Sequence, residues 1–405
     1  MHRFISLFGL LVMVGIAFLL SDERKRVNWR TVLSGIALQL LLGLLILKTS
    51  WGQALFEGAR SFFTGILAYT NEGSKFIFGS LMEVNKFGFI FFVMVLPTII
   101  FMSSLMSILY HLGLMQIIIK ATAKVMVKVM GTSGAESLSA AANIFAGQTE
   151  APLVVRPFIN SMTRSEIMAL MTGGMATVAG GVLAAYVGMG IDAGHLLAAS
   201  VMSAPAALVC AKLLVPETGT SKTQGVVTLD ISKKTANIID AAASGAGDGL
   251  KLALNVGAML LAFIALIALI NGGLSWLGGL FNYPELSLEL VTGYLFSPIA
   301  FIMGVPWDEA FKVGALLGKK LIVNEFVAYL DLQQVSQSLS PRSVIISTYA
   351  LCGFANFSSI AIQVGGIGTI APERRKDLAM LGVKSLIGGT LACFMTACIA
   401  GLFIS

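Results

Sequence analysis

Long apolar stretches are the feature that most constrains what this chain can fold into. A helix needs about 20 mostly apolar residues to cross the hydrocarbon core of a bilayer. Such stretches occur near residues 4–20, 32–48, 87–110, 167–190, 195–214, 249–271, 343–364 and 378–404. Only 12% of the 405 residues are charged, about half the share in a typical soluble domain. We therefore expect an all-α polytopic membrane protein with eight transmembrane helices.

Basic residues in two short loops predict the orientation of the chain. The loops SDERKRVNWR (21–30) and APERRKDL (371–378) are rich in Arg and Lys, so both should be cytoplasmic by the positive-inside rule. Both termini then face outside, and the polar stretch 216–235 is a long cytoplasmic loop. Because the net charge of +6 is carried mainly by short loops beside apolar runs, we expect no binding to nucleic acid.

Two further apolar regions, 113–162 and 284–336, are interrupted by polar and glycine-rich segments. Irregular backbone at membrane depth is tolerated only where protein or a watery cavity surrounds it, so both regions predict re-entrant helical hairpins. A helix start follows each of them. Thr163 and Glu166 have the spacing of a capping box, and Ser340 precedes Pro341 at a first helical position.

The spans that follow the hairpins contain glycine and small polar residues at their centres. The segments GGMATVAGG (173–181) and CGFANFSS (352–359) are typical of discontinuous helices whose unwound backbone binds a ligand. The order of interfacial helix, hairpin, broken helix and intact helix occurs twice, and the two hairpins enter from opposite faces. This pattern predicts an inverted repeat with two broken helices, a frequent plan of secondary transporters.

Polar residues inside these segments are candidates for a functional site, because charged groups are costly in the membrane. Glu150 and Glu325 lie in the two predicted hairpins. Gln148 and Thr149 stand beside Glu150 and offer donors and acceptors for the edge of a heterocycle or an amide. The structural alternative is that each glutamate binds backbone amides at a hairpin tip, and both roles can coexist.

A second set of polar residues lies in and near the predicted breaks. Asn143 and Thr177, with carbonyls of the unwound backbone, can supply oxygen atoms to a small cation, although hydrogen bonding between helices is the alternative. Asn356 and Ser359 are three positions apart, on one face of a helical turn, and lie close to Phe354. Hydroxyl-binding groups beside an aromatic ring suit a sugar or a nucleoside.

Several long segments resemble the signature segments of the concentrative nucleoside transporters. They are GQTEAPLVVRPF (147–158), LNVGAML (254–260), GVPWDEA (304–310), VNEFVAYLDL (323–332) and CGFANFSSIAIQVGG (352–366). The resemblance covers essentially the whole chain. It implies a sodium-coupled symporter, not an enzyme, that takes up nucleosides of the uridine, cytidine and adenosine type by alternating access. It also implies a homotrimer in the lipid bilayer of the bacterial inner membrane, with sodium as the coupling ion and no other cofactor.

The resemblance also implies how the chain is divided. Residues 1–112 and 248–275 would form a scaffold domain that holds the trimer together, with the cytoplasmic loop at 216–247. Residues 113–215 and 276–405 would form the two repeats of a mobile transport domain.

The resemblance assigns roles to individual residues. Gln148 and Thr149, with Glu150 through water, would read the nucleobase, while Val182 and Phe354 line its pocket and Leu252 closes one side. The ribose hydroxyls would bind Glu325, Asn356 and Ser359. The sodium ligands would be the side chains of Asn143 and Thr177 and the carbonyls of Ala146 and Val178. By the same resemblance, the sequence GQTEAP at 147–152 implies sodium rather than proton coupling, because family members that use protons tend to differ at Thr149 and at the Ala-Pro that follows Glu150.

The alternatives are a proton-coupled nucleoside symporter, a channel and a membrane-embedded enzyme. A channel filter is built from identical segments arranged in a ring, which inverted hairpins do not supply. An enzyme needs a general base beside a nucleophile or metal ligands, and the sequence shows two carboxylates without clustered His, Cys or Asp.

Overall fold

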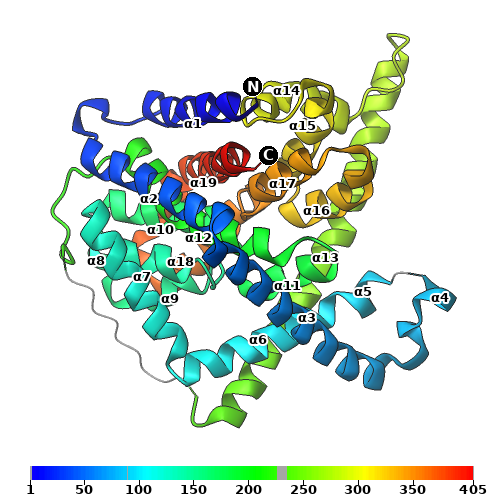
Figure 1. Cartoon of the computed structure of the whole chain (residues 1–405), viewed down its shortest axis with the longest axis horizontal. Helices are drawn as coiled ribbons and strands as arrows, with labels where there is room; N and C mark the ends of the chain where they lie inside the picture. Colours follow the sequence, from blue (N-terminus) through cyan, green and yellow to red (C-terminus); the bar gives the residue numbers. More distant parts are fainter. Residues whose placement is uncertain (1, 89, 226–234, 405) are drawn as a thin grey trace.

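The computed structural model describes residues 2–88, 90–225 and 235–404. Over these residues the regular structure is helical, with one isolated antiparallel bridge between Ser133 and Gln224. Figure 1 shows the two chain ends close together, near helices α1 and α14, and the Arg3 side chain donates a hydrogen bond to the Ile404 carbonyl. The predicted all-α fold is confirmed.

The first part of the chain contains helices α1 to α7. Their bounds are α1 (His2–Leu19), η1 (Arg24–Arg26), α2 (Trp29–Lys48), α3 (Ser50–Phe78), η2 (Gly79–Met82), α4 (Val84–Phe87), α5 (Phe91–Met94), α6 (Leu96–His111) and α7 (Leu114–Met130). The sequence analysis does not predict α3. This helix carries charged residues such as Glu57 and Arg60, which set it apart from the uninterrupted apolar stretches.

The middle part contains the first predicted hairpin and the first predicted broken helix. Its helices are α8 (Gly134–Ala142), α9 (Ala151–Val154), η3 (Arg156–Ser161), α10 (Arg164–Ala176), α11 (Gly180–Gly188) and α12 (Ala193–Leu214). Residues 177–179 are not helical and separate α10 from α11, so the break predicted in GGMATVAGG is confirmed. The predicted capping box of Thr163 and Glu166 is also present at the start of α10.

The last part contains the second predicted hairpin and the second predicted broken helix. Its helices are α13 (Ile238–Gly279), α14 (Leu288–Ile302), α15 (Trp307–Ile322), α16 (Glu325–Val335), η4 (Ser336–Ser338), α17 (Pro341–Leu351), α18 (Phe357–Ile370), η5 (Pro372–Arg374) and α19 (Arg375–Phe403). Residues 352–356 interrupt the predicted span between α17 and α18, which confirms the second break. Ser340 is the N-cap of α17 and Pro341 is its first residue, as predicted.

Among the described residues, seven helices are long and apolar enough to cross a membrane. They coincide with seven of the eight predicted spans. The remaining span, 343–364, is present as α17 and α18, each of which is too short to cross alone. Helices α14 and α15 form a pair bent by 118°. The number of crossings and the two re-entrant hairpins stay predictions.

The predicted loop at 216–247 is partly wrong, because α13 already begins at Ile238. Asn237 caps this helix by accepting a hydrogen bond from the Asp240 N–H at 2.9 Å. Small residues then let α13 pack closely on α6: a Cβ added to Gly245, which precedes the apolar stretch, would lie 2.7 Å from the Ser103 carbonyl oxygen. Capping and this contact extend the helix beyond the apolar stretch. Residues 226–234 of the predicted loop lie outside the described residues.

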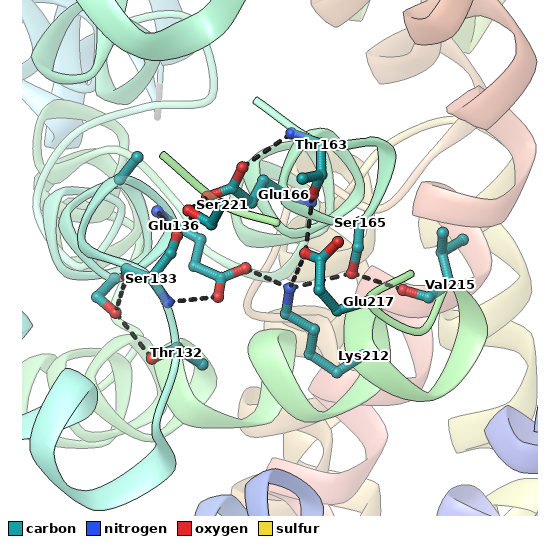
Figure 2. A network of polar contacts seen from close by, with 12 residues as sticks. Thr132, Ser133, Glu136, Thr163, Ser165, Glu166, Lys212, Val215, Glu217 and Ser221 are labelled. Carbon is teal, nitrogen blue, oxygen red and sulfur yellow. Dashed lines mark hydrogen bonds and ion pairs between the residues drawn. The ribbon is translucent and has the colours of Figure 1, made fainter. Parts of the chain in front are cut away.

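A charged network, which we call the Lys212 network, fastens the start of α8 and α10 to the end of α12 (Figure 2). The Lys212 ammonium lies 2.6 Å from Glu136 Oε2 and 3.3 Å from Glu217 Oε2. It also donates to Ser165 Oγ at 3.0 Å. The Lys212 and Glu136 side chains are only 8% and 2% exposed, so this ion pair is buried.

The segment 216–225 completes the network. Glu166 accepts hydrogen bonds from Ser133 Oγ at 2.5 Å and Ser221 Oγ at 2.6 Å. The Thr223 carbonyl accepts from the Gly134 N–H at 2.9 Å. The segment therefore covers the N-terminal ends of α8 and α10, where helix amides otherwise lack partners.

Candidate functional site

Three non-helical segments meet at the centre of the molecule. They are residues 143–150, which link α8 to α9, and the breaks at 177–179 and 352–356. The Phe354 N–H donates to the Thr177 carbonyl at 3.2 Å, and the Gly180 N–H donates to the Phe145 carbonyl at 2.9 Å. Backbone groups at membrane depth need partners within the protein, and the segments supply some of them to one another. We call these segments and the side chains bonded around them the polar centre.

Two asparagines shape the second half of the polar centre by capping helices. Asn356 Oδ1 accepts from the Ser359 N–H at 2.9 Å and caps α18. Asn324 Oδ1 accepts from the Val327 N–H at 3.0 Å and caps α16. Glu325 is then the first residue of α16, where the helix dipole favours a carboxylate.

The Glu325 carboxylate joins three elements. It accepts a hydrogen bond from Tyr186 OH of α11 at 2.8 Å and another from Asn356 Nδ2 at 3.2 Å. The Glu325 side chain is buried, as are both partners. The structure therefore brings together Glu325 and Asn356, which the sequence analysis assigned to the ribose. These bonds go beyond the capping alternative for Glu325.

Gln148 reaches the same helix, α18, from the first half of the chain. Its Nε2 donates to Ser359 Oγ at 3.1 Å, and its Oε1 accepts from Gln363 Nε2 at 3.1 Å. A Cβ added to Gly174 would lie 2.8 Å from Gln148 Cβ and 2.8 Å from Gln363 Nε2. Glycine at this position thus permits the close approach of the Gln148 segment to α10.

Glu150 faces a cavity of about 360 Å³ that lies against α6 and α13. The segment 143–150 and helices α6, α11 and α13 line it, with residues such as Phe145, Glu150, Gly180, Tyr110, Asp248 and Leu252. Glu150 Oε2 accepts from the Gly147 N–H at 3.1 Å, a backbone contact of the kind that the structural alternative expects, although among the described residues the side chain makes no capping hydrogen bond to α9. Leu252 of α13 lies in the wall of this cavity.

The remaining predicted pocket residues lie around the polar centre. A Cβ added to Gly366 of α18 would lie 3.1 Å from the Thr149 methyl carbon, so Thr149 points toward α18. Val182 is buried on α11. Phe354 is half-buried in the second break. No hydrogen bond joins these three residues to the Glu325 carboxylate among the described residues.

Asn143 and Thr177 both lie next to Gly173 of α10. Thr177 Oγ1 donates to the Gly173 carbonyl at 2.9 Å, and a Cβ added to Gly173 would lie 3.0 Å from Asn143 Nδ2. Asn143 Nδ2 donates to the Ser139 carbonyl at 3.0 Å. Asn143 Oδ1 is buried and has no hydrogen-bond partner among the described residues. A buried oxygen without a partner is costly and is available to a ligand.

Two residues of the polar centre were missed by the sequence analysis. Gln363 lies four positions after Ser359 and seven after Asn356, on the same face of α18. Tyr186 lies four positions after Val182 on α11. Both could have been predicted by looking one helical turn, about four positions, beyond the predicted residues Ser359 and Val182.

The fold and the polar centre together define a class of protein. Apolar helices long enough to span a membrane surround two broken helices, and the breaks meet among buried hydrogen-bonding groups. This is the plan of a secondary transporter, in which discontinuous helices bind the transported molecule.

Comparisons with known proteins identify the family. Residues 8–81 match the family Na+ dependent nucleoside transporter N-terminus, residues 92–193 match Nucleoside recognition, and residues 195–401 match Na+ dependent nucleoside transporter C-terminus. The chain is 50% identical to an uncharacterized transporter of Haemophilus influenzae, covering 98% of this chain and 97% of that protein. It is 46% identical to mouse solute carrier family 28 member 3, covering 99% of this chain and 59% of that protein.

Solved structures agree. The chain is similar to CNTnw in an inward-facing substrate-bound state, with a TM-score of 0.94 and 48% identity over 100% of this chain and 98% of that one. A CNTnw variant in an outward-facing state gives a TM-score of 0.95 with the same identity and coverage. The chain belongs to the family of sodium-dependent, concentrative nucleoside transporters. Its family and structural neighbours are transporters and not enzymes.

Proposed function

We propose that this nucleoside transporter is a sodium-coupled symporter that takes up nucleosides across the bacterial inner membrane by alternating access. The observation that carries the proposal is the polar centre itself. There, Gln148 is hydrogen-bonded to Ser359, and Glu325 is hydrogen-bonded to Asn356. Hydrogen-bonding groups suited to a base and to a sugar are therefore close together. The names of the relatives support the substrate class.

Nucleoside binding divides between the two halves of the polar centre. Glu325, Asn356 and Ser359 bind the ribose hydroxyls, because a carboxylate, an amide and a hydroxyl accept and donate on a sugar edge. Gln148 and Thr149, with Glu150 through water, read the base. Val182, Phe354 and Leu252 form the apolar walls, and Leu252 belongs to the cavity that reaches Glu150.

Sodium binds beside residues 148–150, which read the base. Its ligands are Asn143 Oδ1, Thr177 Oγ1 and the carbonyls of Ala146 and Val178, all of them oxygen atoms. The unpartnered Asn143 Oδ1 and the non-helical backbone at 177–179 support this assignment. An ion that orders residues 143–150 also orders Gln148, which couples the two sites. One sodium ion moving inward gains about 2.3 kcal/mol per 100 mV.

The larger assembly follows the same plan. Residues 1–112 and 248–275 form a scaffold domain with four of the eight crossings. Residues 113–215 and 276–405 form a transport domain with the other four crossings and the two re-entrant hairpins. The scaffold holds a homotrimer, and both termini face outside. Exposed apolar side chains on α13, such as Leu261 and Leu269, support burial of this helix in lipid or against another copy.

Uptake of labelled uridine, cytidine and adenosine into proteoliposomes tests the proposal. We expect saturable, concentrative uptake that requires an inward sodium gradient and stops when choline replaces sodium. Uptake driven by a proton gradient in the absence of sodium would establish the proton-coupled alternative. Flux that neither saturates nor follows an ion gradient would establish a channel.

Two substitutions at one hydrogen bond separate the base role from the sugar role. Gln148→Ala and Ser359→Ala both remove the 3.1 Å hydrogen bond between these residues. In the protein without bound nucleoside, both variants therefore lose the same contact. We expect Gln148→Ala to change the ranking of the three nucleosides, whereas Ser359→Ala weakens all three by similar factors. Competition binding on the purified variants measures both, and an unchanged ranking in Gln148→Ala would remove the base-reading role.

A further inference from the structure

Gln363 lies behind Gln148, on the side away from Ser359. Its side chain is completely buried on α18. The Gln363 Nε2 atom donates to Gln148 Oε1 at 3.1 Å and to the Met171 carbonyl of α10 at 3.0 Å. A chain of contacts thus runs from a backbone carbonyl through two side-chain amides to the Ser359 hydroxyl.

The backbone carbonyl determines the direction of this chain. A carbonyl oxygen only accepts hydrogen bonds, so the Gln363 group facing Met171 is the NH2 group. The second hydrogen of that NH2 group points at Gln148, which therefore turns its oxygen toward Gln363. The NH2 group of Gln148 then faces Ser359, leaving one N–H for a ligand.

Reversing either amide is unfavourable. With Gln363 reversed, its oxygen would lie about 3 Å from the Met171 oxygen, and two acceptors would repel each other. With only Gln148 reversed, two NH2 groups would face each other. The present orientation leaves Gln363 Oε1 without a partner among the residues that the structure describes, a cost smaller than losing both bonds of Gln363 Nε2 and adding a repulsive contact.

We infer that Gln363 is a positioning residue that fixes Gln148 as a hydrogen-bond donor toward the nucleobase. The transporter then selects nucleosides that present an acceptor at the position Gln148 contacts, and it discriminates against a donor there. This inference rests on the proposed base-reading role of Gln148. Gly174 is part of the arrangement, because any side chain there would collide with both amides.

Replacing Gln363 by glutamate reverses the chain of contacts. A carboxyl group at this completely buried position is neutral, and its single O–H donates to the Met171 carbonyl, which can only accept. Toward Gln148 the same oxygen therefore accepts instead of donating, so the Gln148 NH2 group turns toward Glu and its oxygen turns toward the site. Gln363→Met removes the bonds altogether and frees Gln148 to adopt either orientation. Gln39 is an equally buried amide on α2 that donates to Thr396 Oγ1 at 3.0 Å, so Gln39→Glu is the matched control for a buried carboxyl group.

The experiment is competition binding to purified, sodium-loaded protein, using uridine, cytidine, 3-deazauridine, 3-methyluridine and 2-thiouridine. Relative to uridine, cytidine changes position 4 and N3 together, the 3-deaza and 3-methyl analogues change N3 alone, and the 2-thio analogue changes position 2 alone; all of them keep the ribose. Gln148→Ala identifies the contacted edge, because this variant loses its preference there. Size-exclusion profiles and retained binding of at least one ligand verify that each variant is folded.

For Gln363→Glu we expect the preference at that edge to invert, with a relative change of about ten-fold. Gln363→Met should flatten the preference to that of Gln148→Ala, and Gln39→Glu should keep the wild-type ranking. A folded Gln363→Glu protein with the wild-type ranking, or with equal weakening of every ligand, overturns the inference. If Gln148→Ala itself keeps the ranking, the proposed function of Gln148 fails instead, so the two failures are distinguishable.

Discussion

The Lys212 network and the polar centre are both buried and polar, yet they differ in how completely their groups are paired. In the network, the Lys212 ammonium lies between two carboxylates and also bonds Ser165. In the polar centre, the buried Asn143 Oδ1 has no hydrogen-bond partner among the described residues, whereas in the network the Glu136 Oε2 atom is held by its ion pair with Lys212. Buried polar groups are normally paired, and exceptions call for a reason. The comparison indicates that the network fastens helices, whereas the polar centre keeps capacity for a ligand.

The two regions lie at opposite ends of the same helices. Glu136 lies in the first turn of α8 and Asn143 is its C-cap; Glu166 lies in the first turn of α10 and Thr177 is its C-cap. The network therefore holds the far ends of the two helices whose near ends shape the polar centre. We expect the network to contribute stability and the polar centre to contribute affinity, and the following changes test this division.

The largest effect should come from Lys212→Met. It removes the cation beside Glu136 and leaves a buried carboxylate unpaired, which costs about 3 to 5 kcal/mol of unfolding free energy. Thermal unfolding in detergent measures the loss. The surviving folded protein should rank nucleosides as the wild type does, and a changed ranking would contradict the division between the two regions.

An exposed ion pair is the control for this change. Lys86 lies 2.5 Å from Glu83, with the two side chains 65% and 48% exposed. Lys86→Met should alter the unfolding free energy by less than about 1 kcal/mol. Adding Glu136→Gln to Lys212→Met should recover part of the lost stability, because it removes the unpaired charge.

Glu325→Gln should have the next largest effect, on affinity. It replaces a charged acceptor for the ribose by a neutral amide, and hydrogen bonds to charged groups contribute roughly 1.5 to 3 kcal/mol. We expect nucleoside affinity to fall roughly ten- to hundred-fold, measured by binding to purified protein. The unfolding temperature should change far less than in Lys212→Met; wild-type affinity in the folded variant would remove Glu325 from the substrate site.

Asn143→Ala should change the sodium dependence. Loss of the unpartnered Oδ1 as a ligand should raise the sodium concentration for half-maximal uptake about five-fold or more. At saturating sodium the ranking of nucleosides should stay the same. Asn160→Ala, at an exposed position, is the control. Identical sodium curves for Asn143→Ala and wild type would place the ion elsewhere.

Tyr186→Phe should give the smallest effect. It removes the hydroxyl that donates to Glu325 at 2.8 Å but retains the ring contacts with Phe326 and Tyr329. A single hydrogen bond contributes about 1 kcal/mol, so we expect nucleoside affinity to fall about five-fold. Tyr329→Phe is the matched control, because its hydroxyl donates to the Thr348 carbonyl and should leave affinity unchanged. Equal loss in both variants would assign Tyr186 a role in packing only.

Local sequence determined much of the architecture. The apolar stretches, the capping residues Thr163 and Ser340, and the glycine-rich breaks were predictable, because each depends on a few neighbouring residues. The glutamates and amides of the polar centre were also detectable, since polar groups are conspicuous in apolar segments. The extension of α13 to Ile238 was not predicted, because its capping and its contact with α6 add to a weak local signal.

Only the tertiary structure decided which of these groups meet. Gln148 and Ser359 are 211 positions apart in sequence, and Tyr186 and Glu325 are 139 apart. Their hydrogen bonds depend on how broken helices pack, and no local spacing encodes that packing. The same holds for Lys212, whose sequence position among apolar residues gives no indication of Glu136 as its partner. Hydrogen bonds and ion pairs act over a few ångströms, so the fold must first bring distant segments together before a binding site exists.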